Sequence, residues 1–124
     1  MMTNPFRDQE KFMKACDQSV TGDEAQYDMY RNLITEEYKE LQEAVEANDR
    51  KEQLDALIDI LVVTIGAIHS AGFDAEGAWK EVMKTNFAKI DSETGKVRKR
   101  EDGKVLKPLG WVAPELAPFL KKND

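Results

Sequence analysis

One carboxylate interrupts an apolar helical stripe, and this conflict constrains the chain more than any other feature. Over residues 23–47 the apolar side chains recur at about 100° per residue, which predicts one long helix with a single apolar face. Glu37 falls inside that face, one turn after Leu33 and about one turn before Leu41. Because a buried, unpaired carboxylate is costly, the Glu37 side chain needs a partner.

The next predicted helix, over residues 51–70, carries more acids beside its apolar face. Glu52, Asp55 and Asp59 share one strip, because they lie three and four residues apart. From Leu57 onward this helix is apolar nearly all round, so we expect Asp55 and Asp59 to be largely enclosed. A chain this short cannot cover such a helix alone. The pattern therefore favours self-association, with a homodimer as the first expectation and a tetramer as the second.

A short turn at residues 48–49 joins the two helices, so we expect them to pack antiparallel. Glu40 and Glu52 then lie at similar heights, and Glu37 and Asp55 lie one turn further on. No basic side chain on these faces neutralises the four acids. Mg²⁺, or alternatively Mn²⁺, prefers oxygen ligands of this kind. The ordinary alternative is a solvated acidic face, and periodicity alone does not separate the two.

Other features disfavour several classes of protein. The only histidine, His69, does not follow a glutamate at the spacing used by di-iron helical bundles, which disfavours iron and zinc. The net charge of −6 argues against binding to a nucleic-acid backbone. The longest apolar run, residues 60–68, is shorter than the roughly 20 residues of a membrane span, and no signal peptide is visible. We therefore expect a cytoplasmic protein that binds neither nucleic acid nor membrane.

The overall pattern predicts an all-α bundle in a single domain covering residues 1–124. Four helices are expected within about residues 4–88, and an irregular or hairpin tail over residues 89–124. Turn signals at residues 92–95 and 101–103 favour a small hairpin or ordered loop in this tail. The strand and helix alternation of an α/β fold is absent.

The acidic residues also spell a family pattern. Residues 36–40 read Glu-Glu-x-x-Glu, and residues 52–55 read Glu-x-x-Asp. Residues 81–89 follow with Glu-Val-x-x-x-Asn-x-x-Lys. In this order the motifs resemble those of the all-α NTP pyrophosphatases, the superfamily of MazG, dimeric dUTPases and phosphoribosyl-ATP pyrophosphohydrolase. The resemblance extends over residues 30–112, and includes a tail similar to that of single-domain MazG-like proteins.

The resemblance assigns roles by position. The implied Mg²⁺ ligands are Glu37, Glu40, Glu52 and Asp55. Glu36 would be a further ligand or the base that orients the attacking water, so Glu36 and Glu37 are the candidate catalytic residues. Asp59 would be a substitute ligand or would support one of the ligands. Asn86 and Lys89 would contact the phosphates of the substrate.

The reaction implied by the resemblance is Mg²⁺-dependent hydrolysis of an NTP or dNTP to the monophosphate and pyrophosphate. Charge neutralisation, an activated water and a clamp on the leaving group are what this chemistry needs. The nearest alternative is phosphoribosyl-ATP pyrophosphohydrolase. A further alternative is a non-catalytic helical binding or regulatory protein whose acids form a charged surface. A carboxylate-bridged di-metal oxidoreductase is disfavoured because no Glu-x-x-His pair is present.

The tail has two readings. Its basic residues suit either a flap that closes over a triphosphate or a solvated hairpin whose charges discourage edge pairing; they are Lys96, Arg98, Lys99, Arg100, Lys104 and Lys107. Trp79 and Trp111 are more typical of core or interface anchors than of base-stacking residues.

Overall fold

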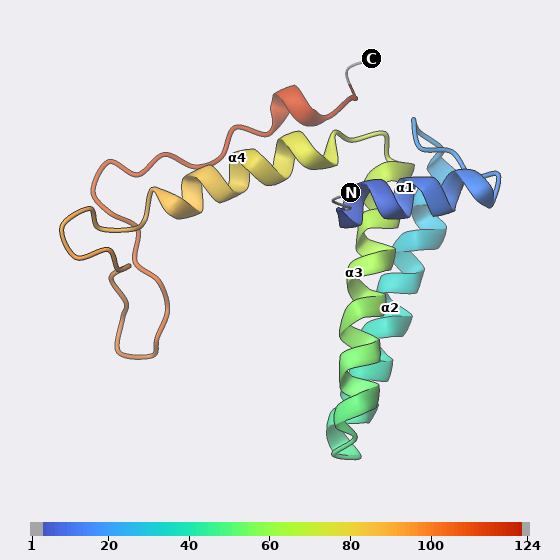
Figure 1. Ribbon diagram of the computed structural model, residues 1–124, viewed down its shortest axis with the longest axis horizontal. Coiled ribbons are helices and arrows are strands. Elements are labelled where there is room, and N and C mark those ends of the chain that lie inside the picture. The colour runs from blue at the N-terminus through green and yellow to red at the C-terminus, as the bar shows by residue number, and fades with distance from the viewer. Residues whose placement is uncertain (1–3, 123–124) are drawn as a thin grey trace. The chain divides into compact units, whose positions relative to one another are not determined.

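The computed structural model describes residues 4–122 and shows an all-α protein, as the sequence predicts (Figure 1). Its elements are α1 (Pro5–Ala15), α2 (Glu24–Glu46), α3 (Arg50–Ser70), α4 (Ala75–Phe87) and a 3-10 helix, η1 (Ala117–Phe119). Within residues 4–122 there is no β-strand. The described chain forms two compact units: one runs to Ala75 and resumes at Leu120, and the other is Glu76–Phe119.

The sequence predicts a single domain over residues 1–124, with a helical part and a tail. The helical part of that prediction, residues 4–88, corresponds to α1 through α4. Residues 1–3 and 123–124, which the predicted domain of residues 1–124 includes, lie outside the described residues. That all 124 residues act as a single functional domain stays a prediction.

Side-chain caps begin the first three helices. Each cap is a short polar side chain in extended backbone that accepts a hydrogen bond from a backbone N–H in the first turn. The Oδ1 atoms of Asn4, Asp23 and Asp49 accept from the backbone nitrogens of Arg7, Gln26 and Glu52 at 2.8, 3.0 and 3.1 Å. Pro5 occupies the first position of α1, where its missing N–H costs nothing. These caps place the acid-bearing turns of α2 and α3 in a defined register.

Helices α2 and α3 form an antiparallel hairpin and lie side by side in Figure 1. The connecting turn places Asn48 at a φ of 54°, a left-handed conformation that asparagine tolerates better than most residues. Helix α1 packs across α3 near the far end of this hairpin. The buried core between the three helices consists of Met13, Val20, Tyr30, Val63 and Ala67.

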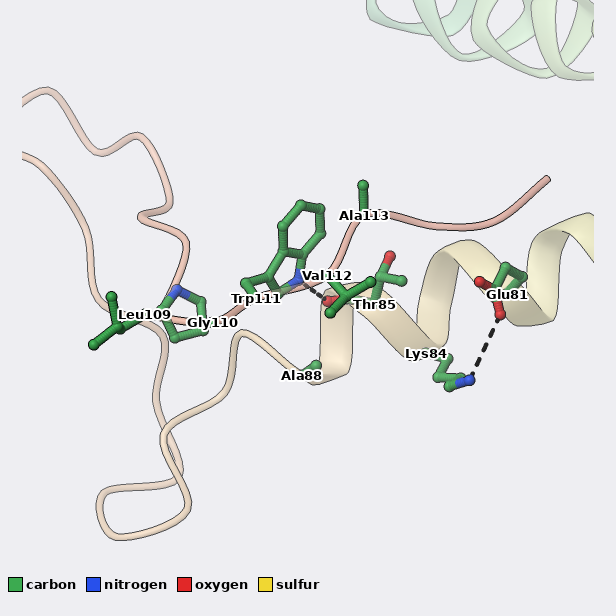
Figure 2. A pocket seen from close by; sticks show the side chains of 10 residues that line it. Glu81, Lys84, Thr85, Ala88, Leu109, Gly110, Trp111, Val112 and Ala113 are labelled. Atoms are coloured by element: carbon green, nitrogen blue, oxygen red, sulfur yellow. Dashed lines mark hydrogen bonds and ion pairs between the residues drawn. The ribbon is translucent and has the colours of Figure 1, made fainter.

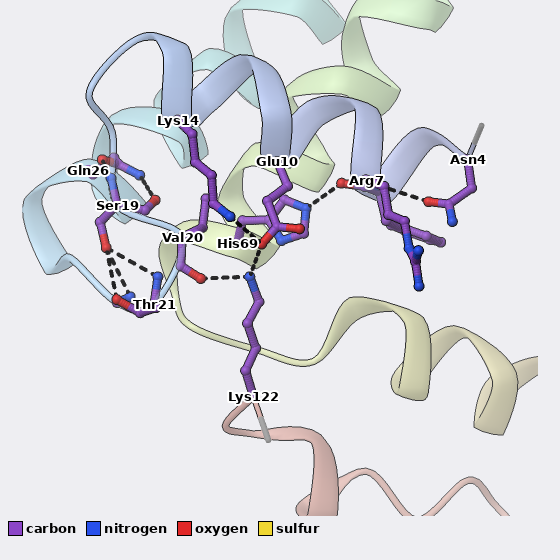
Figure 3. Close-up of polar contacts among 12 residues, drawn as sticks. Asn4, Arg7, Glu10, Lys14, Ser19, Val20, Thr21, Gln26, His69 and Lys122 are labelled. Atoms are coloured by element: carbon purple, nitrogen blue, oxygen red, sulfur yellow. Dashed lines mark hydrogen bonds and ion pairs between the residues drawn. The ribbon is translucent and has the colours of Figure 1, made fainter. Parts of the chain in front are cut away.

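A network of polar contacts fastens the loop between α1 and α2 to the end of α3 (Figure 3). Gln26 donates from Nε2 to the carbonyl of Ser19 and to the hydroxyl of Ser70, each at 2.7 Å. Its Oε1 accepts from the Ser19 backbone N–H at 2.9 Å. Near the C-terminus, Lys122 Nζ donates to the carbonyl of Val20 at 2.6 Å and lies 3.6 Å from the Glu10 carboxylate. The amide and the ammonium group thus fix the same loop from two sides.

Helix α3 exposes one apolar face. The exposed fractions are 63% for Leu54, 51% for Leu57, 50% for Ile58 and 47% for Leu61. By length and composition, α3 is the one helix in the described part of the chain that could cross a membrane. The core helix of a soluble protein has the same profile, so this is weak support for a membrane span.

The expected enclosure of the α3 acids is wrong for Asp55, which is exposed, while Asp59 is half-buried. The apolar neighbours of Asp55, such as Leu57 and Ile58, are themselves about half exposed in the single chain. Side chains that are themselves half exposed shield a neighbouring carboxylate poorly from water. Enclosure of Asp55 would need a further surface against α3.

The second unit consists of α4 and the tail that follows it. Two isolated antiparallel bridges, Ile90 with Val97 and Lys99 with Val105, close two successive turns at the predicted turn signals, and we call residues 90–105 the hairpin. Beyond the hairpin, the tail is fixed to α4 by two hydrogen bonds. Trp111 Nε1 donates to the carbonyl of Thr85, and the backbone N–H of Glu115 donates to Glu81 Oε2, each at 2.7 Å.

Candidate functional site

Glu37 lies midway along α2, and its Oε2 atom is buried without a hydrogen-bond partner. Burial is the main reason that its pKa is raised to about 7. A hydrogen bond with Glu40 and the negative charges of Glu40, Asp59 and Asp55 raise the pKa further. The conflict seen in the sequence is therefore present in the fold, since one oxygen of this carboxylate is withdrawn from water and its neighbours are other acids.

Asp59 extends the same group from α3. Burial raises its pKa, followed by the charges of Asp55 and Glu40. We call Glu37, Glu40, Asp55 and Asp59 the acid cluster, because each of them contributes to a raised pKa of another member or carries one. None of the ion pairs found within residues 4–122 includes a member of the acid cluster. The cluster thus concentrates negative charge that no ion pair among these residues balances.

A pocket of about 390 Å³ opens beside the cluster, at the turn between α2 and α3. Three of the predicted metal ligands line it, namely Glu40, Glu52 and Asp55. Asp49, which also lines it, is engaged as the cap of α3. Glu36 is exposed on α2. The antiparallel hairpin therefore brings Glu40, Glu52 and Asp55 to one pocket and Glu37 next to it, while the role of each residue stays a prediction.

The acid cluster has the chemistry of a divalent cation site but not a closed coordination shell. In the part of the chain that the structure describes, no group of three or more His, Cys, Asp or Glu side chains is arranged so that it could hold a metal ion. The carboxylates are near enough to raise one another's pKa, which acts over longer distances than coordination. Carboxylate oxygens and the orphaned Glu37 Oε2 fit a hard cation such as Mg²⁺.

Asn86 and Lys89, the predicted phosphate contacts, belong to the second unit, at and just after the end of α4. Lys89 Nζ donates to Asn86 Oδ1 at 3.1 Å. The amide nitrogen of Asn86 lies 3.7 Å from Met83 Sδ, a weak acceptor. The two residues therefore contact each other, and Asn86 holds the Lys89 ammonium group in place. Whether they bind phosphate stays a prediction.

The sequence did not connect Lys89 with two residues of the tail. The Lys89 and Lys107 ammonium nitrogens lie 5.0 and 4.9 Å from the centroid of the Trp111 ring. In the sequence, Lys107 was only one of several tail cations, and Trp111 only a candidate anchor. No local spacing links residue 89 with residues 107 and 111, because the intervening hairpin sets their separation. The fold alone reveals this contact.

A second pocket, of about 400 Å³, lies beside Trp111 in the same unit (Figure 2). Apolar residues of the tail form one wall, including Pro108, Leu109 and Val112, and the other wall is the last turns of α4. The ion pair between Lys84 and Glu81, at 3.8 Å, lies at its edge. The lining of this pocket is largely apolar, unlike that of the acidic pocket beside the α2–α3 turn.

Comparison with known proteins identifies the family. Residues 9–86, more than half of the chain, match the family described as phosphoribosyl-ATP pyrophosphohydrolase. The matched range contains all of α2 and α3 and includes Asn86, but it ends before Lys89 and the tail. No curated protein matches the chain significantly. The chain therefore belongs to the phosphoribosyl-ATP pyrophosphohydrolase family of the MazG-like all-α NTP pyrophosphatases, and is a hydrolase acting on phosphoric anhydrides.

Proposed function

We propose that this protein cleaves the bond between the α- and β-phosphates of a nucleotide substrate in a Mg²⁺-dependent reaction and releases pyrophosphate. The observation that carries the proposal is the half-buried Glu37, whose carboxylate has one buried oxygen without a partner and acidic neighbours instead of a basic partner. A structural role does not explain this arrangement, because an unpaired buried acid destabilises the fold. A site for a divalent cation and a polyphosphate does explain it.

In this proposal the residues of the site have three roles: binding the cation, orienting the attacking water and binding the phosphates. Glu37, Glu40, Glu52 and Asp55 hold the cation, and Asp59 supports them. A bound divalent cation would neutralise charge on the phosphate oxygens and lower the pKa of a bound water. Glu36 is exposed, so its carboxylate is free to accept a hydrogen bond from the attacking water and orient it. Asn86 and Lys89 bind the phosphates, with Lys89 supplying the positive charge.

Phosphoribosyl-ATP is the first substrate to test, because the match over residues 9–86 is to the family named for it. Plain NTPs and dNTPs are the second candidate. The tail supports this second candidate, since it lies outside the matched range and resembles that of single-domain MazG-like proteins. The two candidates share the bond that is broken, but phosphoribosyl-ATP carries a phosphoribosyl group that plain NTPs and dNTPs lack.

We also propose that a second copy of the chain covers the exposed face of α3 and forms a homodimer. Four leucine and isoleucine side chains on this face are 47–63% exposed, which is unusual for so apolar a helix. A partner on this face would also enclose Asp55, which stands beside these residues on α3. The dimer would then lower the dielectric around the carboxylates. A tetramer is the alternative.

The decisive experiment is pyrophosphate release from phosphoribosyl-ATP and from a panel of NTPs and dNTPs, with Mg²⁺ and with EDTA. Phosphorus NMR distinguishes pyrophosphate from single phosphate release, so it identifies the bond that is cleaved. We expect release with Mg²⁺, none with EDTA, and a loss in the Glu37→Gln variant. Release of orthophosphate, or release that persists in EDTA, would contradict the proposal. Turnover of phosphoribosyl-ATP alone would select the first candidate, and turnover of NTPs the second.

A further inference from the structure

Two lysines share one indole ring in the second unit. The ammonium nitrogens of Lys89 and Lys107 lie 5.0 and 4.9 Å from the centroid of Trp111, within the range of cation–π attraction. The two ammonium nitrogens therefore lie at most 9.9 Å apart, the sum of the two distances. Lys89 follows the end of α4, whereas Lys107 comes from the tail after the hairpin. Trp111 thus gathers two cations from segments that are distant in sequence.

The charge of these lysines is not balanced. No ion pair found among residues 4–122 includes Lys89 or Lys107, although acidic residues outnumber basic ones in the chain. Lys89 Nζ donates a hydrogen bond to the neutral Asn86 Oδ1 at 3.1 Å. Two like charges repel, so an anion that contacts both ammonium groups relieves this repulsion. A polyphosphate presents several charged oxygens and can contact both ammonium groups.

The Trp111 side chain is fixed before any ligand binds. Its Nε1 donates to the carbonyl of Thr85 on α4 at 2.7 Å, and its ring is half-buried and occupied by the two lysines. A ring engaged in this way is poorly available for stacking on a nucleotide base. Its role is instead to orient the cations, which reduces the side-chain entropy that each lysine loses on binding.

We propose that Lys89 and Lys107, oriented by Trp111, form one binding site for the pyrophosphate group of the substrate. This inference rests on the proposed function, since it names the part of the substrate that the site takes. It adds Lys107 as a phosphate-binding residue and Trp111 as a positioning residue, both outside the residues matched by the family. The tail then takes part in binding instead of serving only as a solvated hairpin.

The test is a titration of the full chain with inorganic pyrophosphate in EDTA, followed by NMR of the two indole N–H groups. The Trp79 indole serves as an internal reference. We expect the Trp111 signal to shift in a saturable way, and Lys107→Ala to weaken binding about tenfold, the effect of losing one charge-assisted hydrogen bond. Lys80→Ala is the matched control, because it removes one exposed positive charge from the same unit. It should change the affinity less than about twofold.

Lys107→Arg, which keeps the charge and can still stack on the ring, should retain binding. Trp111→Ala, whose affinity is measured by isothermal titration calorimetry because it lacks the reporting indole, should also weaken binding. Adding Lys107→Ala to it should weaken binding little further, because the two residues act as a unit. Equal losses in Lys107→Ala and Lys80→Ala would overturn the site, and additive losses would overturn the positioning role of Trp111. Pyrophosphate binding needs no turnover. An inactive enzyme that binds pyrophosphate would therefore contradict the proposed function alone, and an active enzyme unaffected by Lys107→Ala would contradict this site alone.

Discussion

Gly66 on α3 faces the ring of Tyr30 on α2 so closely that a Cβ added at Gly66 would lie 2.4 Å from Tyr30 Cε1. The ring cannot easily move away, because the Tyr30 hydroxyl donates to Gln18 Oε1 at 2.6 Å and the side chain is 5% exposed. The missing side chain of Gly66 therefore sets how closely α2 and α3 approach each other, on the side of the acid cluster away from the α2–α3 turn.

Gly66→Ala should destabilise the fold. Overpacking of a well-packed core costs about 1–3 kcal/mol, which exceeds the gain of up to about 1 kcal/mol from replacing glycine by alanine within a helix. Urea unfolding followed by circular dichroism measures the free energy of unfolding. We expect a lower midpoint with an unchanged slope.

The same substitution in a Tyr30→Ala background is the control. Without the ring, the three atoms nearest to the added methyl group are gone, and the gain in helix propensity should dominate. Gly66→Ala should then be neutral or stabilising, so that its sign reverses. If Gly66→Ala destabilises both backgrounds equally, the contact with Tyr30 is not the cause.

Glu37→Gln should stabilise the metal-free protein and abolish turnover. The amide keeps the size of the carboxylate but carries no charge, so it avoids the cost of burying an anion among acids. Turnover should fall at least about 100-fold, because an amide is a poor substitute for a charged metal ligand. Thermal unfolding in EDTA and pyrophosphate release in Mg²⁺ measure the two effects.

Glu46→Gln is the matched control, since Glu46 is exposed at the last position of α2. It should leave both the melting temperature and the turnover nearly unchanged. Glu40→Gln should reduce turnover as Glu37→Gln does. Full activity of Glu37→Gln or Glu40→Gln would refute their assignment as metal ligands.

The pH dependence of the metal-free protein follows from the same carboxylate. Its pKa is raised from 4.5 to about 7 on folding, so the folded state binds the proton more tightly than the unfolded state. The stability that this proton contributes is complete below pH 4.5 and is lost as the pH rises through about 7. In EDTA, the wild type should therefore lose stability relative to Glu37→Gln over this window. The raised pKa of Asp59 acts in the same direction.

Melting temperatures of the two proteins at pH 5, 6, 7 and 8 measure this difference. Mg²⁺ added at pH 8 should raise the melting temperature of the wild type, because a ligand that binds only the folded state stabilises it. It should raise that of Glu37→Gln much less. Parallel pH profiles for both proteins would show that Glu37 is not the group responsible.

The sequence was informative wherever local chemistry decides the structure. Asn4 and Asp23 cap the first two helices, and the turn at residues 48–49 reverses the chain as expected. The two helices predicted over residues 23–47 and 51–70 begin and end within one residue of those bounds, because caps and breakers act over one turn. The apolar period also identified Glu37 as the misplaced charge, and its carboxylate is the orphan in the fold.

Contacts between distant segments were not predictable in this way. The approach of Tyr30 to Gly66 depends on the rotation of both helices about their axes, which periodicity fixes only approximately. Lys107 meets Trp111 because of the path of the tail, for which no periodic pattern exists. The exposure of Asp55 was predicted wrongly. The hydrophobicity of a helix shows which side chains favour burial, but it does not show whether another segment covers them.

The exposed face of α3 leads to the last prediction. Leu61→Glu should convert the proposed dimer to a monomer, because it places a charge in the middle of an apolar interface. Burying a leucine contributes about 1.5–3 kcal/mol, and a second copy of the same loss acts on the other chain, so dimerisation should weaken at least about 100-fold. Light scattering coupled to size exclusion gives the mass, and the melting temperature of the wild type should rise with protein concentration. Val112→Glu is the control, since Val112 is 76% exposed in the second unit. A wild type that is monomeric at all concentrations would refute the dimer, and would leave the exposed leucines of α3 as a surface for some other partner.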